Sequence, residues 1–216
     1  MQYLTPEMAK EAIMSMKTFH EDVVGVYSKH KMDLLDNLGR RNIVMSQAQE
    51  KFFAQVLSNT YAGVINDGRT GQPDIVIEPL NKELECKLTS RHKSGAISFQ
   101  SDFETLLSKG SLDYLYVIAD HDFKKFAVLH FLGLTTEDFR PLSSGARGKV
   151  SMSKHKGMKK CNVLLGEVNS LNARHINRLN SKLEENNPPY IIKRINKSLD
   201  YWKNTDEKYE ISLEEV

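Results

Sequence analysis

The sequence predicts a mixed α/β fold, with α+β character, in one domain. Helical patterns fill the first quarter of the chain, short β-branched and apolar runs fill the middle, and helical patterns return near the end. With 216 residues, the chain is long enough to bury one sizeable core. Its 40% hydrophobic and 27% charged residues are ordinary for a globular protein. We therefore treat residues 1–216 as a single domain.

Two helices are expected before the first strands. Thr5-Pro6 supplies a hydroxyl N-cap and a proline at the first helical position, so a helix starts there. It either continues to about Leu38 or breaks near Gly25. The Gly-Arg-Arg at 39–41 reads as a break, and Ser46 as the cap of a second amphipathic helix.

The middle of the chain reads as hairpins with one helix between them. The segment 74–78 (DIVIE) is a strand, 79–82 a turn, and 83–88 (ELECKL) the returning strand. A helix follows over about 98–110 and ends at Gly110. The run 112–120 (LDYLYVIAD) is the clearest buried strand, and 126–134 is its hairpin partner.

The last third divides into a basic segment and a helical end. Between Phe139 and Gly166 the sequence has no acidic residue, and glycines make much of it loop-like. The basic segment, about 140–160, is a candidate DNA contact because phosphates are bound by Lys and Arg. Its candidate DNA-binding residues are Arg147, Lys149, Lys154, Lys156, Lys159 and Lys160. Helices are expected over about 170–203.

Several classes of protein are disfavoured by composition. No apolar stretch is long enough for a membrane span, and the N-terminus lacks the pattern of a signal peptide. Two isolated cysteines, Cys86 and Cys161, indicate neither a disulfide framework nor a zinc site, which favours a reducing, cytoplasmic setting. No phosphate-binding G-x-x-x-x-G-K-[ST] loop occurs, so no ATP requirement is expected.

The predicted hairpin carries a concentration of charge that calls for a chemical explanation. Side chains alternate across a strand, so Glu85 and Lys87 share one face while Cys86 points into the core. Asp74 opens the neighbouring strand and can approach Glu85. Two carboxylates that converge repel each other unless a cation lies between them, and Mg²⁺ prefers such oxygen ligands. The backbone carbonyl of Cys86 offers another oxygen, and Lys87 beside the metal could orient or deprotonate water or stabilise charge on a phosphate.

Pro73-Asp74 followed by Glu85-Cys86-Lys87 resembles the PD-(D/E)xK signature of restriction-endonuclease-like nucleases. The resemblance covers about residues 46–132. It implies a central mixed sheet flanked by helices, with the motif on a hairpin. It also implies that Asp74 and Glu85 bind Mg²⁺, with Mn²⁺ as a substitute, and that Lys87 is the catalytic lysine.

Two further residues enter only through this resemblance. Many family members carry a glutamate on a helix before the hairpin, and Glu50 matches that pattern as a further catalytic and metal-binding residue. Several branches carry a glutamine on the helix after the motif, where Gln100 stands as a DNA-contacting candidate. Glu50 could instead serve the dipole of a first helical turn, and Gln100 could be a cap or surface residue.

Structural alternatives stand beside the motif and the basic segment. Glu85 and Lys87 could be a cross-strand ion pair on an exposed strand, and the segment 140–160 could be a solvated loop. Asp74 on the partner strand argues against a simple ion pair, and the lack of acidic residues in the basic segment argues against a solvated loop.

The resulting expectation is a Mg²⁺-dependent endonuclease that cuts double-stranded DNA, most similar to a type II restriction enzyme. A homodimer would read a two-fold site, with the N-terminal helix and residues 171–185 as candidate dimer surfaces. The alternatives are a structure-specific or repair nuclease, such as a junction resolvase, and a DNA-binding protein without nuclease activity.

Overall fold

The computed structural model describes residues 2–67, 69, 72–91, 97–142 and 148–216. The chain divides into two compact units, where the sequence predicts one domain. The first comprises Met1–Glu167 with Ser212–Val216, and the second comprises Val168–Ile211. The second unit contains the helices expected over 170–203.

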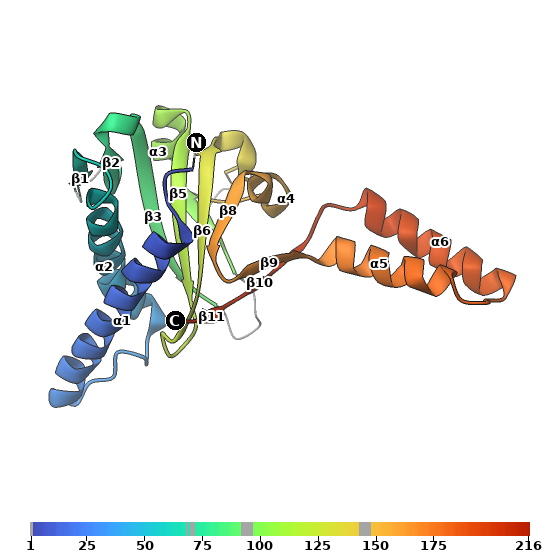
Figure 1. The fold of residues 1–216 in the computed structure, drawn as a ribbon, viewed down its shortest axis with the longest axis horizontal. Coiled ribbons are helices and arrows are strands. Elements are labelled where there is room, and N and C mark those ends of the chain that lie inside the picture. Colours follow the sequence, from blue (N-terminus) through green and yellow to red (C-terminus); the bar gives the residue numbers. More distant parts are fainter. Residues whose placement is uncertain (1, 68, 70–71, 92–96, 143–147) are drawn as a thin grey trace. The chain divides into compact units, whose positions relative to one another are not determined.

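Seven strands of the described first unit form one mixed sheet (Figure 1). Its order is β1-β2-β3-β5-β6-β11, and β8 also pairs with β6. Because helices flank this sheet, the predicted mixed α/β class is confirmed. The strands are β1 (Val64–Asn66), β2 (Ile75–Ile77), β3 (Lys82–Ser90), β5 (Leu112–Ala119), β6 (Lys125–Leu134), β8 (Cys161–Leu165) and β11 (Glu214–Glu215).

The central strands combine antiparallel and parallel pairing. The predicted hairpin is present: β2 pairs antiparallel with β3, and Ile75 lies opposite Leu84. The chain then crosses over and returns as β5, which runs parallel to β3 with Cys86 opposite Leu115. The second predicted hairpin, β5 with β6, is also present, and every residue of β5 is buried.

Each face of the sheet is covered by different elements. Helices α1 (Pro6–Lys29) and α2 (Leu38–Ser58) cover one face, and their apolar side chains join one core with β2, β3 and β5 (Figure 1). On the other face, Phe99 packs edge-on against Tyr116 and Phe131. The middle of the sheet, formed by β5 and most of β6, is therefore buried on both sides.

The predicted break at 39–41 is wrong, because those residues lie inside α2. The helix starts well before the predicted cap at Ser46, at Leu38, where the side chain of Asn37 accepts a hydrogen bond from the Arg40 backbone. Arg41 is fully buried and donates to the carbonyls of Asp120 (3.0 Å) and His121 (2.5 Å). These long-range hydrogen bonds hold the polar segment in the helix, so Ser46 lies in the helix interior and is not its cap.

The helix expected over 98–110 is shorter than predicted. Its first part is instead β4 (Gln100–Asp102), which pairs antiparallel with β7 (Lys149–Ser151). Asp102 then caps α3 (Phe103–Lys109) by accepting from the backbone of Thr105. The helix ends at Gly110 as expected, with a φ of +73° that glycine adopts readily.

In its described part, residues 148–160, the basic segment contains regular structure in place of the predicted loop. Besides β7, this part contains the short helix α4 (Lys154–Gly157) and the 3-10 turn η3 (Met158–Lys160), and the 3-10 turn η2 (Thr136–Asp138) precedes the segment. A further 3-10 turn, η1 (Glu78–Leu80), connects β2 to β3.

The second unit is a helical hairpin based on a short ribbon. Strands β9 (Glu167–Ser170) and β10 (Tyr209–Ser212) pair, and between them run α5 (Leu171–Leu183) and α6 (Pro189–Asn204). Asn172 connects the two helices, because its side chain donates to the carbonyls of Trp202 and Thr205. None of the helices in the described ranges is long and apolar enough to cross a bilayer.

Candidate functional site

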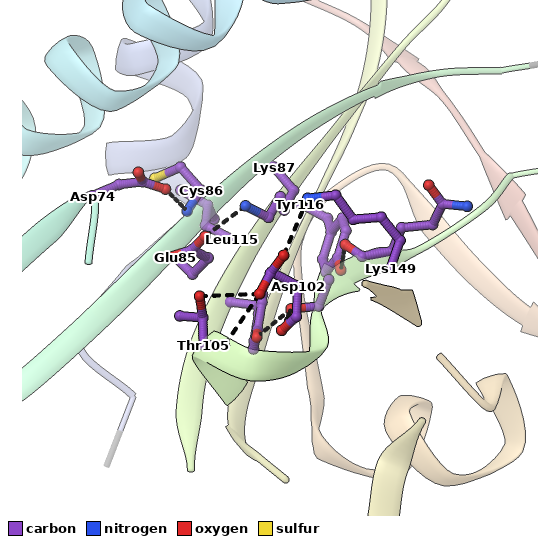
Figure 2. Close-up of polar contacts among 12 residues, drawn as sticks. Asp74, Glu85, Cys86, Lys87, Asp102, Thr105, Leu115, Tyr116 and Lys149 are labelled. Carbon is purple, nitrogen blue, oxygen red and sulfur yellow. Dashed lines mark hydrogen bonds and ion pairs between the residues drawn. The ribbon is translucent and has the colours of Figure 1, made fainter. Parts of the chain in front are cut away.

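The hairpin brings Asp74 against the backbone of β3. Asp74 directly precedes β2, and its Oδ2 accepts a hydrogen bond from the Cys86 N–H at 2.7 Å (Figure 2). A backbone hydrogen bond of this kind holds the carboxylate at one position beside the strand. The register of the hairpin therefore brings Asp74 beside β3, as the sequence predicts.

The carbonyl of Cys86 faces the same edge as Asp74. The N–H and C=O of a strand residue point to the same neighbouring strand, and the Cys86 N–H points to Asp74. Paired residues of β2 reach only as far as Leu84 on β3, so Cys86 lies beyond that pairing. Its thiol points into the core, where burial raises the pKa well above the ordinary value and keeps the thiol neutral.

Glu85 and Lys87 form an ion pair on the opposite face of β3. The Lys87 Nζ donates to the Glu85 Oε1 at 2.5 Å, and both side chains are mostly buried (Figure 2). Burial acts to lower the pKa of Lys87, but the charges of Glu85 and Asp74 outweigh it, and the pKa is raised. Lys87 is therefore a cation at neutral pH.

Glu50 reaches this group from the interior of α2. It lines a hollow of about 290 Å³ together with Asp74, Cys86 and Lys87. Burial, and then the charge of Asp74, raise the pKa of Glu50 to about 7. Burial and the charge of Glu85 raise the pKa of Asp74 to about 6. Since Glu50 lies mid-helix, the helix dipole of a first turn does not account for it.

The acidic side chains are close enough to affect one another without forming a closed cage. In the parts of the chain with described coordinates, no three His, Cys, Asp or Glu side chains are gathered so as to hold a metal ion. Glu85 is engaged with Lys87, whereas Glu50 and Asp74 share the hollow. The carboxylates that line the hollow are thus those of Glu50 and Asp74, and the Cys86 carbonyl adjoins them.

A second hollow, of about 450 Å³, lies on the other side of Lys87. Gln100, Tyr116 and Lys149 line it, together with Thr89 and Ser98. The expectation that Gln100 lies on a helix is wrong, because it belongs to β4, where it lines the same hollow as Lys87. Lys149 lies 3.8 Å from the Asp102 carboxylate (Figure 2). The hollow thus has two lysines, each beside a carboxylate, among several neutral polar groups.

The remaining basic candidates differ in their surroundings. Lys160 donates to the Asp138 carboxylate at 2.7 Å and to the Gly133 carbonyl at 2.9 Å, so it stabilises the fold locally. Lys154 lies over the Phe99 ring, and burial lowers its pKa. Lys156, although exposed, donates to the Glu137 carbonyl, and Lys159 is exposed. Arg147 lies outside the described residues.

Polar residues that line the hollows were missed by the sequence analysis. Asn42 and Ser46 line the first hollow with Glu50, and Tyr116 lines the second. Asn42, Ser46 and Glu50 recur every four residues, which places them on one face of a helix. That spacing was readable in the sequence, but a helix start at Ser46 excluded Asn42 from it.

Comparison of the chain with protein-family models, with curated proteins and with solved structures gives no match.

Proposed function

We propose that the protein is a metal-dependent nuclease that hydrolyses DNA phosphodiester bonds at the site formed by Glu50, Asp74, Glu85 and Lys87. The observation that carries the proposal is the shared hollow, where Glu50 and Asp74 meet Lys87 at the edge of the sheet. The order of elements also supports a restriction-endonuclease-like fold. A helix with Glu50 precedes the hairpin with the PD…ExK residues, and β5 then pairs parallel with β3.

The donor set suits Mg²⁺. This ion binds through one or two carboxylates and keeps several waters, so a cage of three carboxylates is not required. Glu50 and Asp74 are carboxylates whose ionisation burial opposes, and a cation between them would offset both desolvation and repulsion. Asp74, the Cys86 carbonyl and Glu50 would hold the ion, and Glu85 would join them by turning from Lys87.

The chain's own residues supply binding and charge stabilisation. The Cys86 N–H holds Asp74 in place, and Glu85 positions the Lys87 ammonium between the two hollows. A bound Mg²⁺ would supply Lewis acidity and a better nucleophile. Because the pKa of Lys87 is raised, we assign it the stabilisation of negative charge on the attacked phosphate, not the deprotonation of water.

The substrate and assembly belong to the same proposal. The hollow with Lys87 and Lys149 would take a phosphate of the bound strand, and exposed Lys159 would contact the backbone nearby. We favour a type II restriction endonuclease acting on double-stranded DNA as a homodimer. On α1, exposed Met14 and Val26 keep that helix a candidate dimer surface. A junction-type nuclease and a non-catalytic DNA-binding protein remain the alternatives.

The test is DNA cleavage by wild type beside Lys87→Ala. Unmethylated phage-sized DNA is incubated with Mg²⁺ and analysed on a gel, and discrete bands are expected only from wild type. Lys109→Ala is the matched control. Lys109 of α3 forms an ion pair at 2.9 Å with Glu83 of β3, the strand that also carries Lys87, but it lies outside both hollows.

Each result has a distinct meaning. Bands from wild type and Lys109→Ala that are lost in Lys87→Ala would support a sequence-specific nuclease. Equal cleavage by Lys87→Ala would reject the assigned site. Intact linear DNA with cleavage of four-way junctions would favour the structure-specific nuclease, and binding without cleavage of either substrate would favour the non-catalytic alternative.

A further inference from the structure

The helical hairpin of the second unit is strongly basic. Residues 171–204, which span α5 and α6, contain seven lysines and arginines against three acidic residues, a net charge of +4. The whole chain has a net charge of only +2, so the rest of the chain carries −2. Helix α5 itself contains no acidic residue. The positive charge is thus concentrated in a small part of the molecule.

These charges lie on the outer faces of the two helices. In α5, Arg174, Arg178 and Lys182 follow one another at four-residue intervals, about 6 Å apart along one face. All three are exposed, and Arg174 also forms an ion pair with Glu210. Such a row presents several cations to one side.

Helix α6 also carries exposed lysines on its outer face. Lys193 and Lys197 flank Ile195 at two residues on either side, which is about 200° around a helix. Ile195 is buried, so both lysines point away from the interior of the hairpin, and both are exposed.

The apolar sides on which the two helices face each other are occupied. Tyr190, Ile192 and Tyr201 of α6 are exposed, but Ile192 lies roughly opposite the two tyrosines around the helix, so they form no continuous apolar face. Helices α5 and α6 pack along each other (Figure 1), Leu199 is buried, and the Trp202 ring stacks on His175 at 4.2 Å. A membrane-surface helix needs a free apolar face for insertion, and a dimer helix generally buries one. Outer faces of exposed lysine and arginine instead match a polyanion.

We propose that the α5–α6 hairpin is a binding surface for the phosphate backbone of duplex DNA, with Arg178, Lys182, Lys193 and Lys197 as its contacts. This surface replaces the dimer surface expected for residues 171–185. The assignment goes beyond the nuclease site and stands without it, because it rests only on residues of the second unit.

The test is equilibrium binding of the full chain to a fluorescent 30-base-pair duplex in EDTA, where cleavage is blocked. Arg178→Gln/Lys182→Gln removes two adjacent cations of α5. The matched control, Lys10→Gln/Lys29→Gln, removes two exposed cations of α1. Loss of two phosphate contacts is expected to lower the slope of log K against log salt by about 1.8 and to weaken binding roughly tenfold or more at about 0.1 M salt.

The charge-conserving variant Arg178→Lys/Lys182→Arg is expected to bind like wild type, which separates lost charge from lost folding. Unchanged affinity of the Gln variant, or an equal loss in the α1 control, would overturn the proposal. So would hairpin-dependent binding to vesicles of phosphatidylserine without binding to the duplex. Since the assay contains no metal, failure of cleavage in the Lys87 experiment leaves this result unaffected.

Discussion

At the scale of single residues, the unusual feature is that acidic groups are held where ionisation is unfavourable. Glu50 and Asp74 have raised pKa values of about 7 and about 6 because they are buried near other acids. Perturbed carboxylates in a hollow are typical of functional sites, although structural networks also perturb pKa. Their raised pKa values make two consequences measurable without an activity assay.

The first prediction concerns stability and pH. Between about pH 4.5 and pH 7 folded Glu50 holds a proton that the unfolded chain releases, so stability falls as pH rises through this window. Glu50→Gln should flatten that fall and raise the melting temperature at pH 8. Thermal unfolding from pH 4.5 to 8 measures this, with exposed Glu11→Gln as the control. Parallel curves for wild type and Glu50→Gln would contradict it.

The second prediction concerns metal. If Asp74 is a ligand, Mg²⁺ or Mn²⁺ should stabilise wild type at pH 8, by about 2.7 kcal/mol at a hundred times the dissociation constant. Asp74→Ala should lose this stabilisation, whereas Lys87→Ala should keep it, since the lysine is not a ligand. Melting temperatures with the ion and with EDTA measure the difference. A shift in Asp74→Ala as large as in wild type would exclude Asp74 from metal binding.

At the scale of elements, the start of α2 determines the position of Glu50. Buried Arg41 donates to two carbonyls of the β5–β6 turn and, at 2.8 Å, to the Ser90 hydroxyl at the end of β3. It therefore connects the helix to two strands of the sheet. This connection keeps Glu50 at the hollow beside Asp74.

The third prediction tests that connection. Arg41→Ala removes three hydrogen bonds of a fully buried side chain and creates a cavity, so it should lower the free energy of unfolding by about 2–4 kcal/mol. The neighbouring Arg40→Ala, at an exposed position, should change it by at most about 0.5 kcal/mol. Urea denaturation of both variants gives the comparison, and equal effects would show that Arg41 does not anchor the helix.

At the scale of the whole molecule, the two units differ in size and in core. The first unit buries side chains from two helices and a seven-stranded sheet, whereas the second, Val168–Ile211, has few buried residues, among them Asn172, Ile195 and Leu199. Units of this size are marginally stable because they bury a small fraction of their surface. We therefore expect the basic hairpin to be the less stable of the two units.

The fourth prediction follows from the only tryptophan, Trp202, which lies in the second unit. Its fluorescence reports unfolding of the hairpin, whereas far-ultraviolet circular dichroism reports the whole chain. In urea, the fluorescence transition should come first, and Leu199→Ala should shift it to lower urea with little effect on the main dichroism transition. Coincident transitions in wild type would show instead that the two units unfold as one.

The sequence by itself determined the elements whose signals are local. The β5 and β6 strands, the hairpin that brings Asp74 to β3, and the pairing of Glu85 with Lys87 on one face all follow from patterns within a few residues. Alternation along a strand and a short connection leave few other arrangements.

Only the tertiary structure decided features that depend on distant partners. The true start of α2 depends on carbonyls near residue 120, and the strand character of Gln100 depends on pairing with Ser151. The raised pKa values of Glu50 and Asp74 and the ion pair of Lys160 with Asp138 likewise require neighbours far along the chain or on another element. Burial and long-range hydrogen bonds outweigh local propensity at these positions, because a buried polar group without a partner costs more than a few residues of unfavourable propensity.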